Sequence, residues 1–434
     1  MPKVKVIGGG LAGCEAAWQL ARSAVEVDLY EMRPNKMTAV HQTGYLAELV
    51  CSNSLKSETI DTAQGLLKAE MRQLGSIILD SADTCRVPAG SALAVDRIHL
   101  AQEVTRRLQE EPAINIIHEE VTTVPDDPAI IATGPLTGGE FWHSLQALCS
   151  EESLFFYDAV APIVTADSID MQRAFKAARY NKGGADYINC PLYCDEYEQF
   201  YQELITADQH EGHIVDTMQV FEGCMPVEVM ASRGIDTMRY GPMRPVGLPD
   251  PVTGEQYYAV LQLRQEDLHG SLYGLVGFQS RLRWTEQDRI FRLIPALKNA
   301  EFVRYGVMHR NSYINSPRLL RPTLQFAGQP QLFAAGQITG VEGYMESAAS
   351  GIIAGINMAR LIQGKEPWVW PRETMIGSLI NYICTSPGDK LSPMNANFGI
   401  LPPLERIIRN KKQRYEAYSN RAIRVMKEFS ELLS

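Results

Sequence analysis

The sequence opens on Val4-Lys5-Val6-Ile7-Gly8-Gly9-Gly10-Leu11-Ala12-Gly13-Cys14-Glu15, in which a β-branched run gives way to closely spaced glycines and a helical pattern. This order predicts a strand, a tight turn and a helix, the context in which a G-x-G-x-x-G motif binds a dinucleotide. Gly8 permits the turn, Gly10 lets the backbone approach a pyrophosphate, and Gly13 lets the helix pack closely on the strand. The helix start then offers backbone N–H groups to the phosphates.

An acidic residue completes this motif. A second strand is predicted over residues 25–30, and Glu31 at its end is placed to accept hydrogen bonds from a ribose. A glycine-rich turn without a ligand would leave Glu31 unexplained. We therefore predict a dinucleotide site that contains Gly8, Gly9, Gly10, Leu11, Ala12, Gly13 and Glu31.

Length and composition indicate a globular protein of two or more domains. The chain has 434 residues, of which 45% are hydrophobic and 21% charged. No apolar run approaches the length of a membrane span, and Met1-Pro2-Lys3 leads directly into the first strand, which leaves no room for a signal peptide. None of the eight cysteines forms a C-x-x-C pair. We expect reduced thiols in a cytoplasmic protein that does not contact a membrane.

The charge is unevenly distributed along the chain. The net charge of −10 argues against a nucleic-acid partner when taken alone. The segment from Leu404 to Lys427, however, holds eight Lys and Arg residues against Glu405 and Glu416. Because the local field steers a polyanion, a basic surface for nucleic acid stays open, with a solvated C-terminal helix as the alternative.

Two later glycine loops favour a flavin over a nicotinamide as the bound dinucleotide. A strand predicted over residues 129–132 runs into Thr133-Gly134, and another over residues 331–335 runs into a loop from Gly336 to Tyr344. A helix is expected to begin near Met345, and its N-terminus would face the anionic edge of a reduced flavin ring. The residues added to the cofactor site are Gly134, Gly336, Gln337, Glu342 and Tyr344. Gly351 and Gly355, one turn apart, would let this helix lie close to a neighbour.

The predicted fold is α/β, with a Rossmann-like FAD-binding domain and an inserted α+β domain. The strand–helix alternation fades in the middle of the chain, so we assign residues 1–155 and 301–434 to the FAD-binding domain and 156–300 to the insertion. In the FAD-binding domain, single helices are expected over 62–82 and over 96–111, the second capped by Asp96.

Within the insertion we expect helices over 171–179 and 196–206 and a strand over 257–263. The first helix would align Arg173, Lys176, Arg179 and Lys182 as a basic ridge or a solvent-exposed face. Cys190 and Cys194 form a C-x3-C pair without further ligands nearby, so no metal site is predicted.

Two other cysteines lie in settings that suit a reacting thiol. Cys51 is followed by Ser52-Asn53-Ser54, a polar environment unlike that of most buried structural cysteines. Cys224 follows Gly223 at the end of a predicted strand that Pro226 stops. A thiol there would project into a cleft, or it would pack in the core; the local sequence leaves both open.

With these residues in hand, the chain resembles the folate- and FAD-dependent tRNA (uracil-5-)-methyltransferases over essentially its whole length. The two cysteine motifs, together with the last glycine loop, are far more specific than the first loop, which many flavoproteins share. The stretches that carry the resemblance are Gly8–Gly13, Leu49-Val50-Cys51-Ser52-Asn53-Ser54, Phe221-Glu222-Gly223-Cys224-Met225-Pro226 and Phe333-Ala334-Ala335-Gly336-Gln337-Ile338-Thr339-Gly340-Val341-Glu342-Gly343-Tyr344.

The resemblance implies methylation of the T-loop uridine at tRNA position 54 to give 5-methyluridine. The carbon would come from 5,10-methylenetetrahydrofolate, and the reducing equivalents would pass from NAD(P)H through bound FAD. The partner would be the T-arm of tRNA, and no protein partner is evident. In this chemistry a thiolate adds at uracil C6 so that C5 can attack the methylene carbon. We assign Cys224 as the nucleophile and Cys51 as its catalytic partner, with the reverse order left open.

Three other functions stay open at this point. The related flavoprotein family that modifies the wobble uridine of tRNA shares the flavin fold, but we expect a longer chain with an extended helical C-terminal domain for it. A redox-silent, flavin-stabilised tRNA-binding protein would need the basic segment but not the thiols. In an ordinary FAD-dependent reductase of small molecules, the basic segment would have no part in the function.

Overall fold

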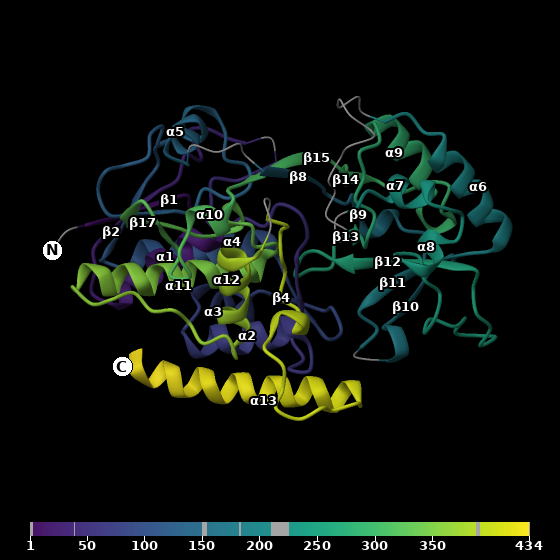
Figure 1. The fold of residues 1–434 in the computed structure, drawn as a ribbon. Helices are drawn as coiled ribbons and strands as arrows, with labels where there is room; N and C mark the ends of the chain where they lie inside the picture. The colour runs from purple at the N-terminus through teal and green to yellow at the C-terminus, as the bar shows by residue number, and fades with distance from the viewer. Residues whose placement is uncertain are drawn as a thin grey trace.

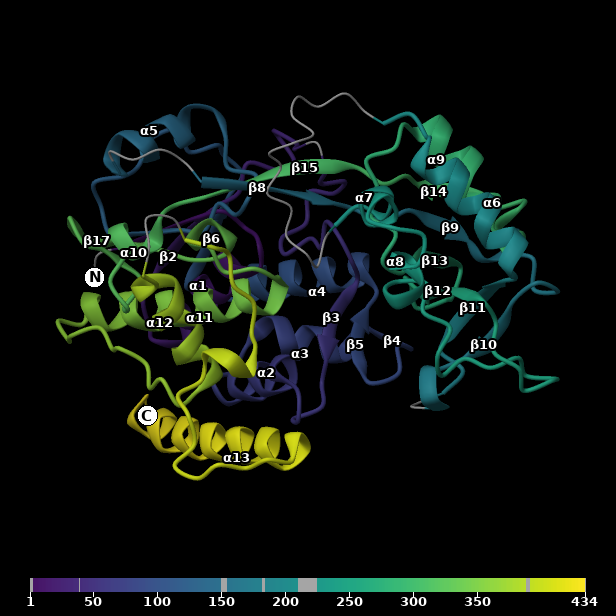
Figure 2. The same ribbon diagram turned by 45° about the vertical axis from the view of Figure 1, so that its right-hand side comes forward.

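The computed structural model describes residues 3–38, 40–149, 154–181, 184–209, 225–387 and 391–433. These residues form two bodies that lie side by side, each built on its own sheet, with a two-stranded ribbon between them (Figures 1 and 2). The first sheet has the strand order β16-β17-β7-β1-β2-β6. Its strands are β1 (Val4–Ile7), β2 (Val27–Tyr30), β6 (Ile114–Ile117), β7 (Ala129–Ile131), β16 (Gln325–Phe326) and β17 (Gln329–Ala334).

The first sheet is parallel except at its β16 edge, and the sequence-predicted strands are confirmed. β1 pairs in parallel with β2 and β7, and β17 extends the sheet in parallel on the far side of β7. Val4, Val6 and Ile7 of β1 are buried, as expected for a central strand covered on both faces. Because the strands are parallel, the loops after β1, β7 and β17 leave the sheet at the same edge.

Two helices from opposite ends of the chain pack on each other beside this sheet. They are α1 (Leu11–Arg22) and α11 (Tyr344–Ile362). A Cβ atom on Gly351 would lie 2.2 Å from the carbonyl oxygen of Ala12, and one on Gly355 would lie 2.7 Å from that of Ala16. The prediction that these two glycines permit a close helix contact is confirmed.

The remaining elements of the first body follow the predictions with one exception. Asp96 caps its helix as expected, since its carboxylate accepts hydrogen bonds from the N–H groups of Ile98 and His99. The single helix expected over 62–82 is wrong, because Gly75 adopts φ +70° and Ser76 caps a new helix. The elements are α2 (Ala63–Gln73), α3 (Ile77–Thr84), α4 (Arg97–Glu110), α5 (Gly139–Cys149), α10 (Ser316–Leu319), α12 (Met375–Thr385), α13 (Lys411–Ser430), and a small sheet of β3 (Ser54–Ser57), β5 (Ala92–Val95) and β4 (Arg86–Val87).

The second body is an antiparallel sheet covered by short helices, with its own hydrophobic core around Phe200, Phe278 and Phe291. Its strand order is β10-β11-β12-β13-β9-β14. The strands are β9 (Ile163–Thr165), β10 (Phe175–Ala177), β11 (Tyr187–Leu192), β12 (Ala259–Gln265), β13 (Leu272–Leu275) and β14 (Phe302–Arg304), and the helices are α6 (Cys194–Ile205), α7 (Val227–Ser232), α8 (Thr237–Tyr240) and α9 (Trp284–Phe291).

One of the two helices predicted for this body is wrong. The segment 171–179 turns at Asp170, which accepts a hydrogen bond from the N–H of Gln172, and then forms the edge strand β10. Side chains alternate between the faces of a strand, so a three-residue spacing does not align them and the predicted basic ridge does not form. Lys182, its fourth member, lies outside the described residues. The helix expected over 196–206 is confirmed as α6, and the strand expected over 257–263 is β12, shifted by two residues.

The ribbon between the bodies consists of β8 (Leu154–Ala159) and β15 (Met308–Tyr313), which pair antiparallel. The chain passes through this ribbon once on its way into the second body and once on its way out. We propose that the two cores mark two domains, 1–155 with 301–434 and 156–300. Within the described ranges, no helix combines the length and the apolar character that a membrane crossing requires.

A buried carboxylate that caps α12 gives a prediction for stability. Glu70 accepts hydrogen bonds from the N–H groups of Met375 and Ile376, at 2.8 Å each. Burial raises the pKa of Glu70 to about 8 from its ordinary 4.5, although these backbone hydrogen bonds oppose the rise. A raised folded-state pKa stabilises the protein fully below the unfolded pKa, and this contribution is lost as pH rises through the folded value.

The free energy of unfolding is therefore expected to fall between pH 5 and pH 8, with a contribution from Glu70 of up to about 1.4 kcal/mol per pH unit. Glu70→Gln keeps an acceptor oxygen but cannot ionise, so the free energy of unfolding of this variant should fall less steeply over this pH range. Denaturant unfolding at pH 6, 7 and 8 measures the difference, and parallel curves for the two proteins would contradict this account.

Candidate cofactor and thiol site

A cavity lies at the edge of the first sheet where the loops after β1, β7 and β17 meet. Ten of the predicted cofactor residues line it: Gly8, Gly9, Gly10, Leu11, Ala12, Glu31, Gly134, Gly336, Gln337 and Tyr344. The other two lie directly behind its wall. Gly13 packs against Gly8, and Glu342 accepts a hydrogen bond from the side chain of Gln337. The structure therefore brings together three loops that are far apart in the sequence.

The first glycine loop has the shape that its sequence predicts. Gly8 has φ +107°, and a Cβ atom there would lie 2.4 Å from the carbonyl oxygen of Ala132. A Cβ atom on Gly13 would lie 1.8 Å from the carbonyl oxygen of Gly8. Gly10 is the N-cap of α1, where no side chain caps the helix, and among the described residues, apart from its two chain neighbours, no heavy atom lies within 4 Å of the position of its Cβ. The helix start is thus open toward the cavity, as an anion-binding N-terminus requires.

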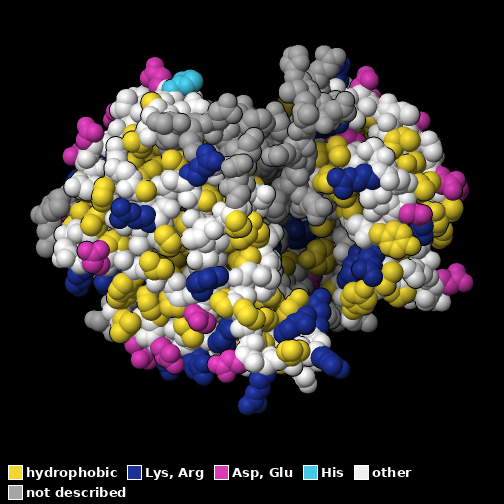
Figure 3. Space-filling view, in the orientation of Figure 1, with side chains coloured by type: hydrophobic (Ala, Val, Ile, Leu, Met, Phe, Trp, Pro, Cys, Tyr) yellow, Lys and Arg dark blue, Asp and Glu magenta, His cyan; other side chains and the backbone are white. Residues whose placement is uncertain are grey.

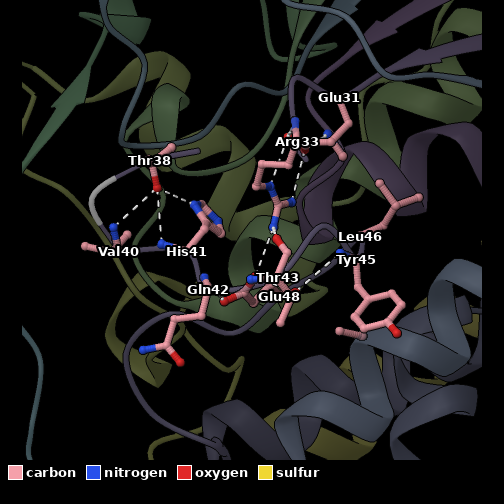
Figure 4. A network of polar contacts seen from close by, with 12 residues as sticks. Glu31, Arg33, Thr38, Val40, His41, Gln42, Thr43, Tyr45, Leu46 and Glu48 are labelled. Carbon is pink, nitrogen blue, oxygen red and sulfur yellow. Dashed lines mark hydrogen bonds and ion pairs between the residues drawn. The ribbon is translucent and has the colours of Figure 1, made fainter. Parts of the chain in front are cut away.

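A buried ion-pair network forms one end of the cavity (Figure 4). Glu31 accepts hydrogen bonds from the N–H of Gly9 at 3.0 Å and from the guanidinium of Arg33 at 2.9 and 3.1 Å. Arg33, which is 2% exposed, also donates to Glu48 at 3.1 Å. Burial acts to raise the pKa of Glu31, but the hydrogen bonds and charge of Arg33 outweigh it and lower the pKa. Glu31 is therefore an ionised carboxylate whose position is held by Gly9 and Arg33. Its contact with a ribose stays a prediction.

The same network holds a loop over this end of the cavity. Glu48 accepts hydrogen bonds from the N–H groups of Gln42 and Thr43 at 2.8 and 3.0 Å. Farther along the loop, the hydroxyl of Thr38 lies 2.6 Å from Nδ1 of His41, and both residues line the cavity (Figure 4). Sequence reasoning missed Arg33, because Met32-Arg33-Pro34 looks like an ordinary strand exit. An arginine directly after the acidic residue of the motif was the available signal.

Tyr344 connects the cavity to Cys51. It is the first residue of α11 and lines the cavity, and its hydroxyl accepts hydrogen bonds from the N–H groups of Cys51 at 2.7 Å and Ser52 at 3.2 Å. Cys51 is partly exposed. The structure thus places one of the two predicted catalytic thiols beside the cofactor cavity. Cys224 lies outside the described residues.

The turn that carries Cys51 is also held from the second body. The guanidinium of Arg264, on β12, donates to the side chains of Asn53 at 2.6 Å and Ser52 at 2.7 Å. Arg304, on β14, donates to the carbonyl oxygen of Val50 at 2.6 Å. Burial and the neighbouring charge of Arg97 lower the pKa of Arg304. Sequence reasoning missed both arginines, because nothing in their local sequence indicates these distant contacts.

Cys190 and Cys194 do not lie in a setting comparable to that of Cys51. Cys190 is buried in β11, whereas Cys194 is exposed at the start of α6, and both are free thiols. Burial raises the pKa of Cys190 well above its ordinary value. Among the described residues, no three His, Cys, Asp or Glu side chains gather as metal ligands.

Comparisons with known proteins identify the family. Residues 3–366 match the profile of the family described as "Glucose inhibited division protein A". The chain is 59% identical to a protein of Syntrophomonas wolfei over 100% of both chains, and 58% identical to one of Moorella thermoacetica over 98% of this chain and 97% of the other. Both are named methylenetetrahydrofolate--tRNA-(uracil-5-)-methyltransferase TrmFO. The chain belongs to the TrmFO family. The resemblance drawn from the glycine and cysteine motifs is confirmed.

A further relative agrees with this membership of the TrmFO family, and more distant structures share the fold. A TrmFO of Bacillus subtilis is 54% identical over 99% of both chains. Two crystal forms of Aquifex aeolicus GidA superpose with TM-scores of 0.70 and 0.71 at 17% and 18% identity. They cover 99% of this chain, which spans 73% and 76% of theirs. At this identity the likeness shows the fold alone, and it confirms the α/β prediction.

Proposed function

We infer that this chain methylates uridine in tRNA at C5, with 5,10-methylenetetrahydrofolate as the carbon donor and FAD as the bound cofactor. The observation that carries this function is the hydrogen bond between Tyr344, which lines the dinucleotide cavity, and the backbone of Cys51. This hydrogen bond brings a thiol next to the proposed flavin site. The TrmFO relatives are named methylenetetrahydrofolate--tRNA-(uracil-5-)-methyltransferases, and a thiol nucleophile together with a two-electron donor suits that reaction.

The residues of the cavity fit FAD. The open face of Gly10 and the uncapped start of α1 suit a pyrophosphate, and Glu31 lies at the end of β2 where a ribose is expected. Gln337 and Tyr344, at the start of α11, would then border the isoalloxazine ring. When bound, FAD supplies the two electrons, drawn from NAD(P)H, that reduce the transferred carbon to a methyl group.

In the proposed reaction, the thiols of Cys224 and Cys51 carry out the other steps on the uracil ring. In our assignment the thiolate of Cys224 forms a bond to C6, and the electrons of the C5–C6 double bond move toward O4, which makes C5 a nucleophile. Once C5 carries the new carbon, the thiolate of Cys51 removes the C5 proton, and the bond between that carbon and its donor nitrogen breaks to leave an exocyclic methylene on the ring. Two-electron reduction of this methylene to a methyl group then expels the thiolate of Cys224 from C6. Tyr344 and Arg304 position Cys51 for this proton transfer, because Tyr344 accepts from the N–H groups of Cys51 and Ser52 and Arg304 donates to the carbonyl oxygen of Val50.

We further propose that the target is the T-loop uridine at position 54 and that the T-arm suffices as substrate. The family resemblance supports this choice. Purified protein would be incubated with methylene-labelled tetrahydrofolate, NADPH and either a T-arm minihelix or the same minihelix carrying cytidine at position 54. Label in the first RNA only is the expected result. Label at the wobble uridine of full tRNA, or label that requires S-adenosylmethionine, would refute the proposal.

Tyr344→Phe tests the connection between the cavity and the thiol. The change leaves the N–H groups of Cys51 and Ser52 without this acceptor, which costs about 1–3 kcal/mol and lets the turn shift. We expect kcat for tRNA methylation to fall about tenfold. FAD content and the rate of flavin reduction by NADPH should stay unchanged, because the ring of residue 344 is kept. Equal losses in both half-reactions would instead indicate a general defect of the cavity.

A further inference from the structure

Five basic residues gather at the start of α13 and in the segment before it. This basic end of α13 consists of Arg406, Arg409, Lys411, Lys412 and Arg414. All but Arg414 are exposed. Among the described residues, their one ion pair joins Lys412 to Glu416, at the long distance of 4.0 Å. The cluster therefore carries an excess of positive charge that the fold itself does not neutralise.

The placement of these charges opposes helix stability. The N-terminus of a helix carries a partial positive charge, and each cation in the first turn costs about 0.3–1 kcal/mol. The first turn of α13 contains no acidic residue. A helix that served only as a solvated surface would gain from the reverse arrangement, so stability does not account for this cluster.

Contacts made by other side chains of α13, and not by the Lys and Arg side chains themselves, hold the basic end in place. Ala422 and Met426 of α13 are buried, and the hydroxyl of Ser419 donates to the carbonyl oxygen of Ile60 at 2.6 Å. Near the start of the helix, the ring of Tyr415 stacks on Phe398 with centroids 4.3 Å apart. The cations are thus mounted on a fixed element, and a ligand need not order a flexible tail to meet them.

The basic end lies toward the second body. Figures 1 and 2 show α13 along the underside of the first body, beneath α2, with its N-terminal end on the side of the second sheet. In Figure 3, Lys and Arg side chains gather at this lower edge and continue along the hollow between the bodies.

We propose that the basic end of α13 binds the phosphate backbone of the substrate tRNA. The proposal rests on the tRNA methyltransferase function above and adds the surface that receives the RNA. Lys and Arg side chains donate to phosphate oxygens without reading bases, so this surface positions tRNA and the site around Cys51 selects the uridine. Displacement of condensed counterions by these side chains supplies much of the affinity.

The test compares two triple variants of the full protein with the same change in charge. The first, Arg406→Gln, Arg409→Gln and Lys411→Gln, removes three cations of the basic end. The matched control, Arg106→Gln, Lys298→Gln and Lys365→Gln, removes three exposed cations elsewhere. Binding of unmodified tRNA would be measured at 50–300 mM salt, together with KM and kcat. Melting temperature, FAD content and reduction by NADPH serve as checks of folding.

For the first variant we expect the slope of log affinity against log salt to shrink by about two to three and affinity at 150 mM salt to fall at least about tenfold. KM for tRNA should rise accordingly, with kcat at saturating tRNA unchanged. The control should match the wild-type protein. Equal salt slopes and equal tRNA affinities for the two variants would refute the proposed tRNA-binding surface, but they would not contradict the proposed methyltransferase function. A wild-type protein that binds tRNA through this cluster but does not methylate it would refute the proposed function alone.

Discussion

Replacing Cys51 with alanine is expected to lower methyl transfer to tRNA by about 10²–10⁴-fold, the usual contribution of a positioned proton-transfer group. The protein should stay folded and yellow, because Cys51 lies beside the cavity and is not among the residues that line it. Flavin reduction by NADPH should proceed at the wild-type rate. A Cys51→Ala protein with full methylation activity would remove this thiol from the mechanism.

The order of the two thiols can be decided with tRNA that carries 5-fluorouracil, which traps the adduct at C6 because the fluorine cannot leave as a proton. We expect a stable protein–RNA adduct with Cys51→Ala and none with Cys224→Ala. Survival of the adduct in Cys224→Ala and its loss in Cys51→Ala would reverse the two roles. Mass spectrometry of the digested adduct identifies the attached cysteine directly.

Gly13→Ala is expected to prevent formation of the cofactor site and to destabilise the first body by at least about 3 kcal/mol. The added Cβ would lie 1.8 Å from the carbonyl oxygen of Gly8, a backbone atom that cannot move without opening the contact between β1 and α1. Denaturant unfolding measures the loss, and absorbance at 450 nm measures the retained flavin.

Gly10→Ala is the matched control from the same loop. Apart from its chain neighbours, no heavy atom in the described part of the chain lies within 4 Å of its Cβ position, so the apoprotein should be as stable as the wild type. The same methyl group would occupy the face that a pyrophosphate approaches, and we expect FAD affinity to fall at least about tenfold. Equal destabilisation by both substitutions would contradict this reading of the loop.

Local sequence predicted the elements whose causes are local. The glycine loops, the cap at Asp96 and the helix α6 each depend on residues within one or two turns, and all were predicted correctly. The two wrong helices failed for different reasons, one local and one tertiary. Gly75 takes a left-handed conformation inside an otherwise helical pattern, and the segment 171–179 pairs with β11, which tertiary structure decides.

The site was only partly accessible from the sequence. Cys51 stood out by its polar neighbours and Tyr344 by its glycine loop, but nothing in either stretch shows that they touch. Their hydrogen bond joins positions 293 residues apart. The contacts of Arg264 with the Cys51 turn span 211 and 212 positions. Such contacts follow from the packing of two bodies and have no signature in the local pattern.

The pairing of α1 with α11 has a consequence for biosynthesis. Strand β1 and helix α1 leave the ribosome more than 300 residues before β17, which extends their sheet, and α11, whose Gly351 and Gly355 pack on α1. The strands of the second sheet, by contrast, are contiguous between Ile163 and Arg304. On a nascent chain the second body can therefore finish folding while the first still waits for its partner helix. The cofactor cavity can therefore close only after α11 has been made, so a chain that is terminated before α11 would leave the ribosome without its cofactor.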